Sequence, residues 1–216
     1  MNPTSLDHVA LWVADRDHIA DFATAHLGMH VIDRTDRFTL IGSDARRGKL
    51  TLFEAEGSRD PGVLARVGLR VSDLESATAA LPPGTPDVFD LGEGLLVTLV
   101  EGETDVEYDL DHVALRSPDP ERAAREWRRF GFAEAGDSRV EVGGAFVELI
   151  EGEPGESERP LLNHLGVLVE EAAPAQNGGF DVADVVDAPN TFAVFVWGPD
   201  RVKLEYVEHK ASFSLR

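Results

Sequence analysis

The string LDHVAL occurs twice in this chain, at residues 6–11 and again at residues 110–115. A six-residue identity that includes a histidine is hard to obtain by chance, and such self-similarity is the sequence signature of a repeated structural unit. Apolar residues at helical spacing follow each copy, over residues 15–27 and 118–130, and a glycine beside an apolar residue ends both segments. Short strand-like runs separated by turn residues come next. Each copy therefore predicts a βαβββ module.

A second, weaker repeat has one copy in each half of the chain. Residues 66–71 (RVGLRV) resemble residues 164–169 (HLGVLV), 98 residues later, with a glycine at the same place. The chain thus predicts an α+β fold of four modules, two of them abbreviated. An acidic stretch at residues 102–109 lacks periodicity and marks the joint between halves. We expect one module pair in residues 1–105 and another in residues 106–216.

Composition narrows the possible partners and cofactors. The net charge of −20 argues against a nucleic-acid partner, because phosphate contacts need clustered basic residues. No apolar run approaches the roughly 20 residues needed to cross a bilayer, so we expect no membrane partner and a cytoplasmic location. The chain has no cysteine, which excludes thiolate chemistry and means that any metal must be held by His, Asp or Glu.

Four residues recur at matched places in the third and fourth modules. His112 and His164 stand near the start of the first strand of each module, and Glu148 and Glu205 stand in the last strand. A polar residue inside an apolar strand lies either on the solvent face or in a cavity that needs it. One such residue alone is most simply solvated or hydrogen-bonded, but four at matched positions indicate a shared site.

With these residues the sequence resembles the vicinal oxygen chelate superfamily, which includes glyoxalase I, methylmalonyl-CoA epimerase, bleomycin-binding proteins and type I extradiol dioxygenases. The resemblance implies that pairs of βαβββ modules form cup-like curved mixed sheets, with metal ligands on the first and last strands. It places His112, Glu148, His164 and Glu205 at the ligand positions. Such donors suit a divalent ion of the Zn, Ni, Co, Fe or Mn type, whose identity stays open.

The N-terminal half fits the same template poorly. His8 takes the first ligand position, Glu54 lies near the second although a gap-free match puts Phe53 there, and Arg66 and Thr98 take the third and fourth. Because arginine is a fixed cation and cannot be a metal ligand, we predict a metal-free N-terminal cup with a structural or regulatory role. The simplest interpretation of the remaining histidines, at positions 18, 26, 30 and 209, is surface or helix-end placement.

The resemblance leaves three functions open. The first is metal-dependent isomerisation, epimerisation or lyase-type proton transfer on a small substrate, with Glu205 or Glu148 as the base. The second is ring cleavage by an Fe(II) dioxygenase that uses His112, His164 and Glu205; a further histidine near the iron is missing, and Glu148 would crowd the metal. The third is a metal-free drug-sequestering protein. A monomer and a homodimer are both compatible with tandem modules.

Overall fold

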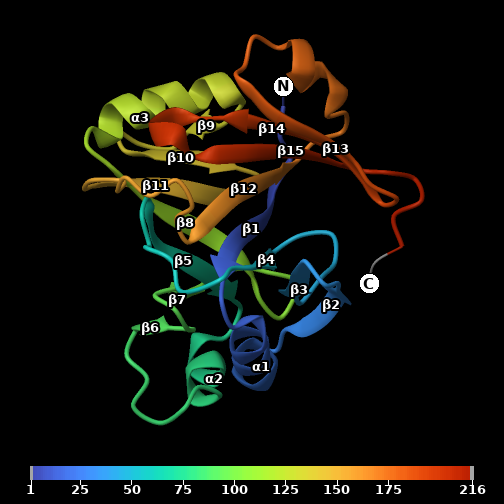
Figure 1. The fold of residues 1–216 in the computed structure, drawn as a ribbon. Coiled ribbons are helices and arrows are strands. Elements are labelled where there is room, and N and C mark those ends of the chain that lie inside the picture. Colours follow the sequence, from blue (N-terminus) through green and yellow to red (C-terminus); the bar gives the residue numbers. More distant parts are fainter. Residues whose placement is uncertain (1, 215–216) are drawn as a thin grey trace.

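A computed structural model describes residues 2–214, and it contains the four predicted modules (Figure 1). The first comprises β1 (Ser5–Val13), α1 (Arg16–His26), β2 (His30–Arg34), β3 (Phe38–Gly42) and β4 (Lys49–Glu54). The second is one strand shorter, with β5 (Leu64–Val71), α2 (Leu74–Ala79), β6 (Val88–Asp90) and β7 (Leu96–Glu101). The third comprises β8 (Asp109–Ser117), α3 (Pro120–Trp127), the 3-10 turn η1 (Arg128–Phe130), β9 (Ala133–Glu134), β10 (Arg139–Val142) and β11 (Ala145–Glu151). The fourth comprises β12 (Leu162–Leu168), η2 (Ala173–Asn177), β13 (Val182–Asp187), β14 (Thr191–Trp197), η3 (Pro199–Arg201) and β15 (Lys203–His209).

Each α-helix begins after an aspartate that caps it. The side chains of Asp15, Asp73 and Asp119 accept a hydrogen bond from the backbone N–H three residues further on. This contact satisfies one of the helix donors that have no partner within the helix. The fourth module has no such cap, and Pro174 interrupts its segment, so only a short 3-10 turn forms there.

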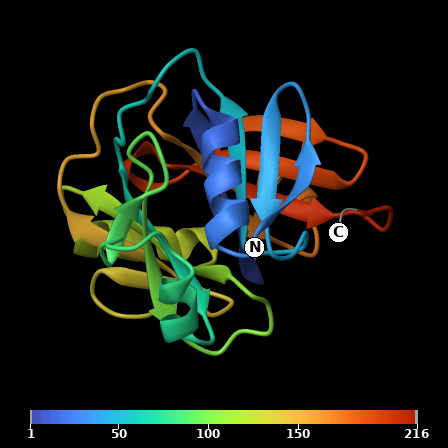
Figure 2. The ribbon, with the colours of Figure 1, turned by 90° about the horizontal axis from the view of Figure 1, so that it is seen from below.

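The strands form two mixed sheets, which confirms the predicted α+β fold with two cups. The eight-stranded sheet has the order β13-β14-β15-β12-β1-β4-β3-β2, and the seven-stranded sheet has the order β6-β7-β5-β8-β11-β10-β9. In both, the first strands of two modules meet antiparallel at the centre, and the last strand of each module runs parallel to its first. Seen from below, α1 lies across the strands of its own module (Figure 2).

The pairing of modules differs from the expected one. The first module pairs with the fourth, through β1 and β12, and the second pairs with the third, through β5 and β8. Residues 1–105 and 106–216 therefore do not each form a cup, and the expected division is corrected: each cup takes one module from either half. Among residues 2–214, no helix is long and apolar enough to cross a membrane.

The buried aspartates of the two LDHVAL copies provide a physical reason for this pairing. Asp7 is neutralised by Lys49 of its own module, whose Nζ atom lies 2.8 Å from the carboxylate. Lys49 lies opposite His8, and the residue opposite His112 in the third module is Phe146, which has no charge. Asp111 instead accepts two hydrogen bonds, of 2.9 and 2.8 Å, from Arg70 of the second module. The fourth module has leucine 168 at the place of Arg70, so pairing with it would leave the Asp111 carboxylate without a cation.

Candidate metal centre

A one-residue bulge precedes the first ligand position of every module. In β1, Leu6 lies opposite Val167 and His8 lies opposite Gly166, so Asp7 is an extra residue in the ladder. The same shift occurs at Ala65 in β5, Asp111 in β8 and Asn163 in β12. A bulge redirects side chains that would otherwise alternate between faces. It lets Asp7 contact the ring of the adjacent His8 at 2.7 Å.

A glycine on the neighbouring strand makes room for the histidine ring. A Cβ atom at Gly166 would come within 2.2 Å of the His8 imidazole, and one at Gly68 would come within 2.3 Å of the His112 imidazole. No real side chain fits at such distances, so these two glycines are needed for close packing rather than for backbone freedom. Gly166 and Gly68 are the glycines at matching places in the weaker repeat of residues 66–71 and 164–169. Gly166 of the fourth module makes room for His8 of the first, and Gly68 of the second module makes room for His112 of the third.

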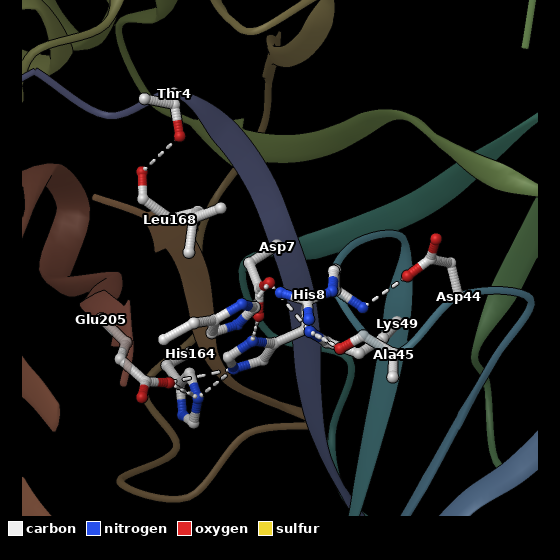
Figure 3. A network of polar contacts seen from close by, with 11 residues as sticks. Thr4, Asp7, His8, Asp44, Ala45, Lys49, His164, Leu168 and Glu205 are labelled. Carbon is white, nitrogen blue, oxygen red and sulfur yellow. Dashed lines mark hydrogen bonds and ion pairs between the residues drawn. The ribbon is translucent and has the colours of Figure 1, made fainter. Parts of the chain in front are cut away.

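Three side chains from three adjacent strands converge on one point of the eight-stranded sheet (Figure 3). The Nε2 atoms of His8 and His164 are 2.9 Å apart, and the Glu205 Oε2 atom lies 3.0 Å from the first and 2.8 Å from the second. All three residues are buried, with exposed fractions of 8%, 4% and 7% respectively. Unrelated surface residues do not form a nearly equilateral triangle of buried donor atoms.

The other ring nitrogen of each histidine is held by the residue before it. His8 Nδ1 donates to Asp7 Oδ2, and His164 Nδ1 donates to Asn163 Oδ1 at 3.0 Å. Asp7 is fixed in turn by Lys49 and by His209, whose Nε2 atom is 3.3 Å from Asp7 Oδ1. With Nδ1 donating, Nε2 is the nitrogen that faces the common centre in both rings and would bind an ion there once it carries no proton.

The electrostatics of the cluster favour a positive charge at its centre. Burial alone would lower the pKa of His8, but the Glu205 and Asp7 carboxylates outweigh it and raise the pKa to about 9. Burial would raise the pKa of Glu205, yet the two imidazoles hold it at about 2. Burial lowers the pKa of His164 despite the neighbouring glutamate. One positive charge is therefore stabilised between the carboxylates, and a metal ion in place of the proton would supply it.

Thr51 stands at the remaining ligand position of this sheet, on the last strand of the first module. The register of β12 and β15 puts Gly166 opposite Glu205, and the equivalent pair in β1 and β4 is Ala10 opposite Thr51. Glu54 and Phe53, which the sequence suggested for this position, do not occupy it. Glu54 is ion-paired with Arg16 at 2.9 Å, and the ring centroid of Phe53 lies 6.1 Å from that of His164. The site thus offers two imidazoles and one carboxylate.

The structure does not bring the four expected ligands together. His164 and Glu205 lie in the eight-stranded sheet with His8, whereas His112 and Glu148 lie in the seven-stranded sheet with Arg66. The expected grouping failed because it assumed that the two modules of each half of the chain share a cup. His8 was assigned to the cup without metal, although it carries the same LDHVAL motif as His112. The need of Asp111 for a cation was the one sequence signal that could have indicated the true pairing.

Comparisons with known proteins agree with this architecture. Residues 5–83 match the model of the Glyoxalase/Bleomycin resistance protein/Dioxygenase superfamily. A putative dioxygenase from Bacillus subtilis superposes with a TM-score of 0.76 at 16% identity, covering 98% of this chain and 87% of that chain. Glyoxalase I from Zea mays gives 0.73 at 15% identity, with 94% and 92% covered, and cppA from Streptococcus pneumoniae gives 0.67 at 16%, with 96% and 99% covered. No curated protein matches the chain significantly by sequence.

These findings establish the fold: the chain has the paired βαβββ fold seen in the glyoxalase and dioxygenase superfamily, as the resemblance of its sequence predicted. The sequence pattern of that superfamily is matched over residues 5–83, which span the first module and the start of the second. At identities of 15–16% with these structures, the likeness establishes the fold and leaves activity to be argued from the site.

The buried ion pair behind the site predicts a large effect on stability. Lys49→Met should lower the free energy of unfolding by about 3 to 5 kcal/mol, because it leaves the Asp7 carboxylate buried with its main cation removed. Urea denaturation followed by circular dichroism measures this. The matched control is Lys210→Met, which removes a partner of the exposed Asp187 and should cost less than about 1 kcal/mol. Equal losses in both variants would contradict the assigned role of Lys49.

Proposed function

We propose that this protein is a divalent-metal-dependent enzyme in which His8, His164 and Glu205 hold the ion. The observation that carries the proposal is the convergence of their donor atoms within 3.0 Å of one another. Metal bonds of about 2.0 to 2.2 Å to nitrogen and oxygen require donor atoms roughly 3 Å apart. The Nδ1 contacts with Asp7 and Asn163 are the outer partners that orient such imidazoles.

The protein's own residues would prepare the site for a small substrate with two adjacent oxygens. A bound divalent metal would act as a Lewis acid that stabilises negative charge developing on those oxygens. Partly buried aromatic rings of Phe53 and Phe195 flank His164, with ring centroids 6.1 and 5.1 Å from it. These rings would exclude water beside the ligands and so strengthen electrostatic interactions there.

The ligand set supports oxygenation as the first candidate reaction. Two histidines and one carboxylate with open positions form the arrangement typical of non-haem Fe(II) oxygenases. Glu148, which would have crowded such a site, belongs to the other sheet, and Thr51 stands at the fourth ligand position. A ring-cleaving reaction on a catechol-type substrate is therefore the favoured candidate.

A second candidate is proton transfer next to a carbonyl, as in isomerisation, epimerisation or elimination. The observation that supports it is that, within residues 2–214, no further His, Asp or Glu donor joins the three-residue cluster. The additional histidine that assists ring cleavage in extradiol enzymes is thus not among these donors. Glu205 is the one carboxylate of the cluster and would serve as the base.

Elemental analysis of untagged protein is the first test. We expect one equivalent of a divalent metal per chain, or its uptake when Fe(II), Zn or Ni is added. Oxygen consumption with catechol by the anaerobically reconstituted Fe(II) form tests oxygenation. Loss, in D₂O, of the C–H signal of the hemithioacetal that a 2-oxo aldehyde forms with a thiol, followed by NMR, tests proton transfer. A folded protein that takes up no metal would refute the enzyme proposal and favour a drug-sequestering cup.

Gly166 offers a test that leaves every ligand in place. Gly166→Ala should lower metal affinity by about 10- to 100-fold, as does the loss of an outer-shell partner, because the new methyl group displaces the His8 ring. Competition with a chromophoric chelator measures the affinity. Gly68→Ala is the matched control, since it displaces His112 by the same contact in the other sheet. If the control weakens metal binding as much as Gly166→Ala does, the ligand assignment is wrong.

A further inference from the structure

The seven-stranded sheet has the same four ligand positions as the metal centre, two on the first strands of its modules and two on their last strands. In each module, the residue two places after the first ligand position lies opposite the second ligand position. In the eight-stranded sheet these pairs are Gly166 with Glu205 and Ala10 with Thr51. In the seven-stranded sheet they are Ala114 with Glu148 and Gly68 with Thr98. The first ligand positions are then His112 and Arg66, where the other sheet has its two histidines. Three of the four positions thus have the same composition in both sheets: one His, one Glu and one Thr. They differ only in arginine against histidine.

The supports around these positions are also the same. His112 follows a bulge at Asp111, donates from Nδ1 to the Asp111 carboxylate at 2.8 Å and lies over a glycine. Arg66 follows a bulge at Ala65 and faces Ala114, just as His164 follows a bulge and faces Ala10. An ordinary ion pair on a sheet needs none of these features.

The guanidinium of Arg66 lies between the two remaining ligand atoms. Its Nη2 atom donates to Glu148 Oε2 at 2.5 Å, and its Nε atom donates to His112 Nε2 at 3.3 Å. The group thus contacts the same imidazole nitrogen and carboxylate oxygen that a metal would bind. Because a guanidinium stays charged, it supplies a permanent positive charge there.

We infer that the seven-stranded sheet contains a second site for a divalent metal, which has one imidazole and one carboxylate of the first site's donor set and which the side chain of Arg66 keeps closed. Removing this side chain alone leaves two donors, too few for a stable site. Replacing it with histidine restores the set of two imidazoles and one carboxylate beside a threonine. The inference concerns the other sheet and therefore goes beyond the proposed function.

The test is the metal content of Arg66→His. After equilibration with Zn²⁺ and dialysis, the variant should hold one more zinc per chain than the wild-type protein, as measured by elemental analysis. Arg66→Ala should show no gain, and Arg66→His combined with His112→Ala should return to the wild-type content. Circular dichroism and thermal melting verify that each variant is folded.

The test counts the zinc that Arg66→His gains over the wild-type protein. Its result therefore distinguishes the second site from the proposed metal centre at His8, His164 and Glu205. A wild-type content of zero with a gain of one in Arg66→His would refute the proposed metal centre and support the second site. A folded Arg66→His with no gain would overturn the second site and leave the first unaffected. If that variant does not fold, Arg66→Cys carries the same expectation, since a thiolate also binds zinc and the chain has no other cysteine.

Discussion

Replacing His8 with alanine should yield a folded chain that no longer retains a metal ion. The substitution removes one of two nitrogen donors from a three-residue set and leaves a 2.8 Å pair of His164 and Glu205. Loss of an outer partner already costs 10- to 100-fold in metal affinity, so loss of a ligand should cost at least about 100-fold. At a metal concentration of 100 times the wild-type Kd, the ion stabilises the wild-type fold by about 2.7 kcal/mol. The variant should show no metal-dependent rise in Tm.

His112→Ala is the matched control for this prediction. His112 occupies the same place in the same six-residue motif, with the same Asp partner and the same glycine contact, but its Nε2 atom faces Arg66. Its replacement should leave metal content and the metal-dependent Tm shift unchanged. The reverse pattern, with metal lost in His112→Ala and kept in His8→Ala, would mean that the ligands are those expected from the order of modules along the chain.

Separating the chain into residues 1–105 and 106–216 should abolish folding of both pieces. Each piece would lose its partner along the central ladders of both sheets, β1 with β12 and β5 with β8. The Asp111 carboxylate would also lose Arg70. We expect neither piece alone to give a cooperative melting transition, whereas the two refolded together should regain one and form a 1:1 complex. Circular dichroism and gel filtration measure both outcomes. Two pieces that melt cooperatively alone would contradict the interleaved pairing.

Local structure was predictable from the sequence because it depends on short-range signals. The repeated LDHVAL string, the helical spacing after it and the turn residues between strands define the four modules and most of their elements. Two of the three clustered residues, His164 and Glu205, were also among the expected ligands. They were identifiable because both lie in one module, where relative position follows from strand order alone.

The pairing of this fourth module with the first was not predictable from the spacing of apolar residues. Any two first strands can pair antiparallel, and each possible pairing would bury similar apolar faces. A buried charge favours the observed pairing, since Asp111 has Phe146 where Asp7 has Lys49 and takes Arg70 of the second module as its cation. Register was equally hidden: a gap-free match of residues 53–57 to residues 148–152 puts Phe53 at the ligand position on the last strand of the first module, with Glu54 beside it, whereas the ladder puts Thr51 there. These shifts of two and three residues change which side chain faces the site.

The interleaved sheets also determine the order in which parts of this molecule become able to fold during synthesis. His8 and His164 are 156 residues apart, so β1 is made long before the strand that covers its edge. At about 5 to 20 residues per second, the ribosome needs on the order of ten seconds or more to deliver that partner. The seven-stranded sheet, built from consecutive modules, can close earlier around β5 and β8. Contacts so distant in sequence form slowly. The three-residue cluster is therefore assembled last, and an ion held there would mark a chain whose final strand is in place.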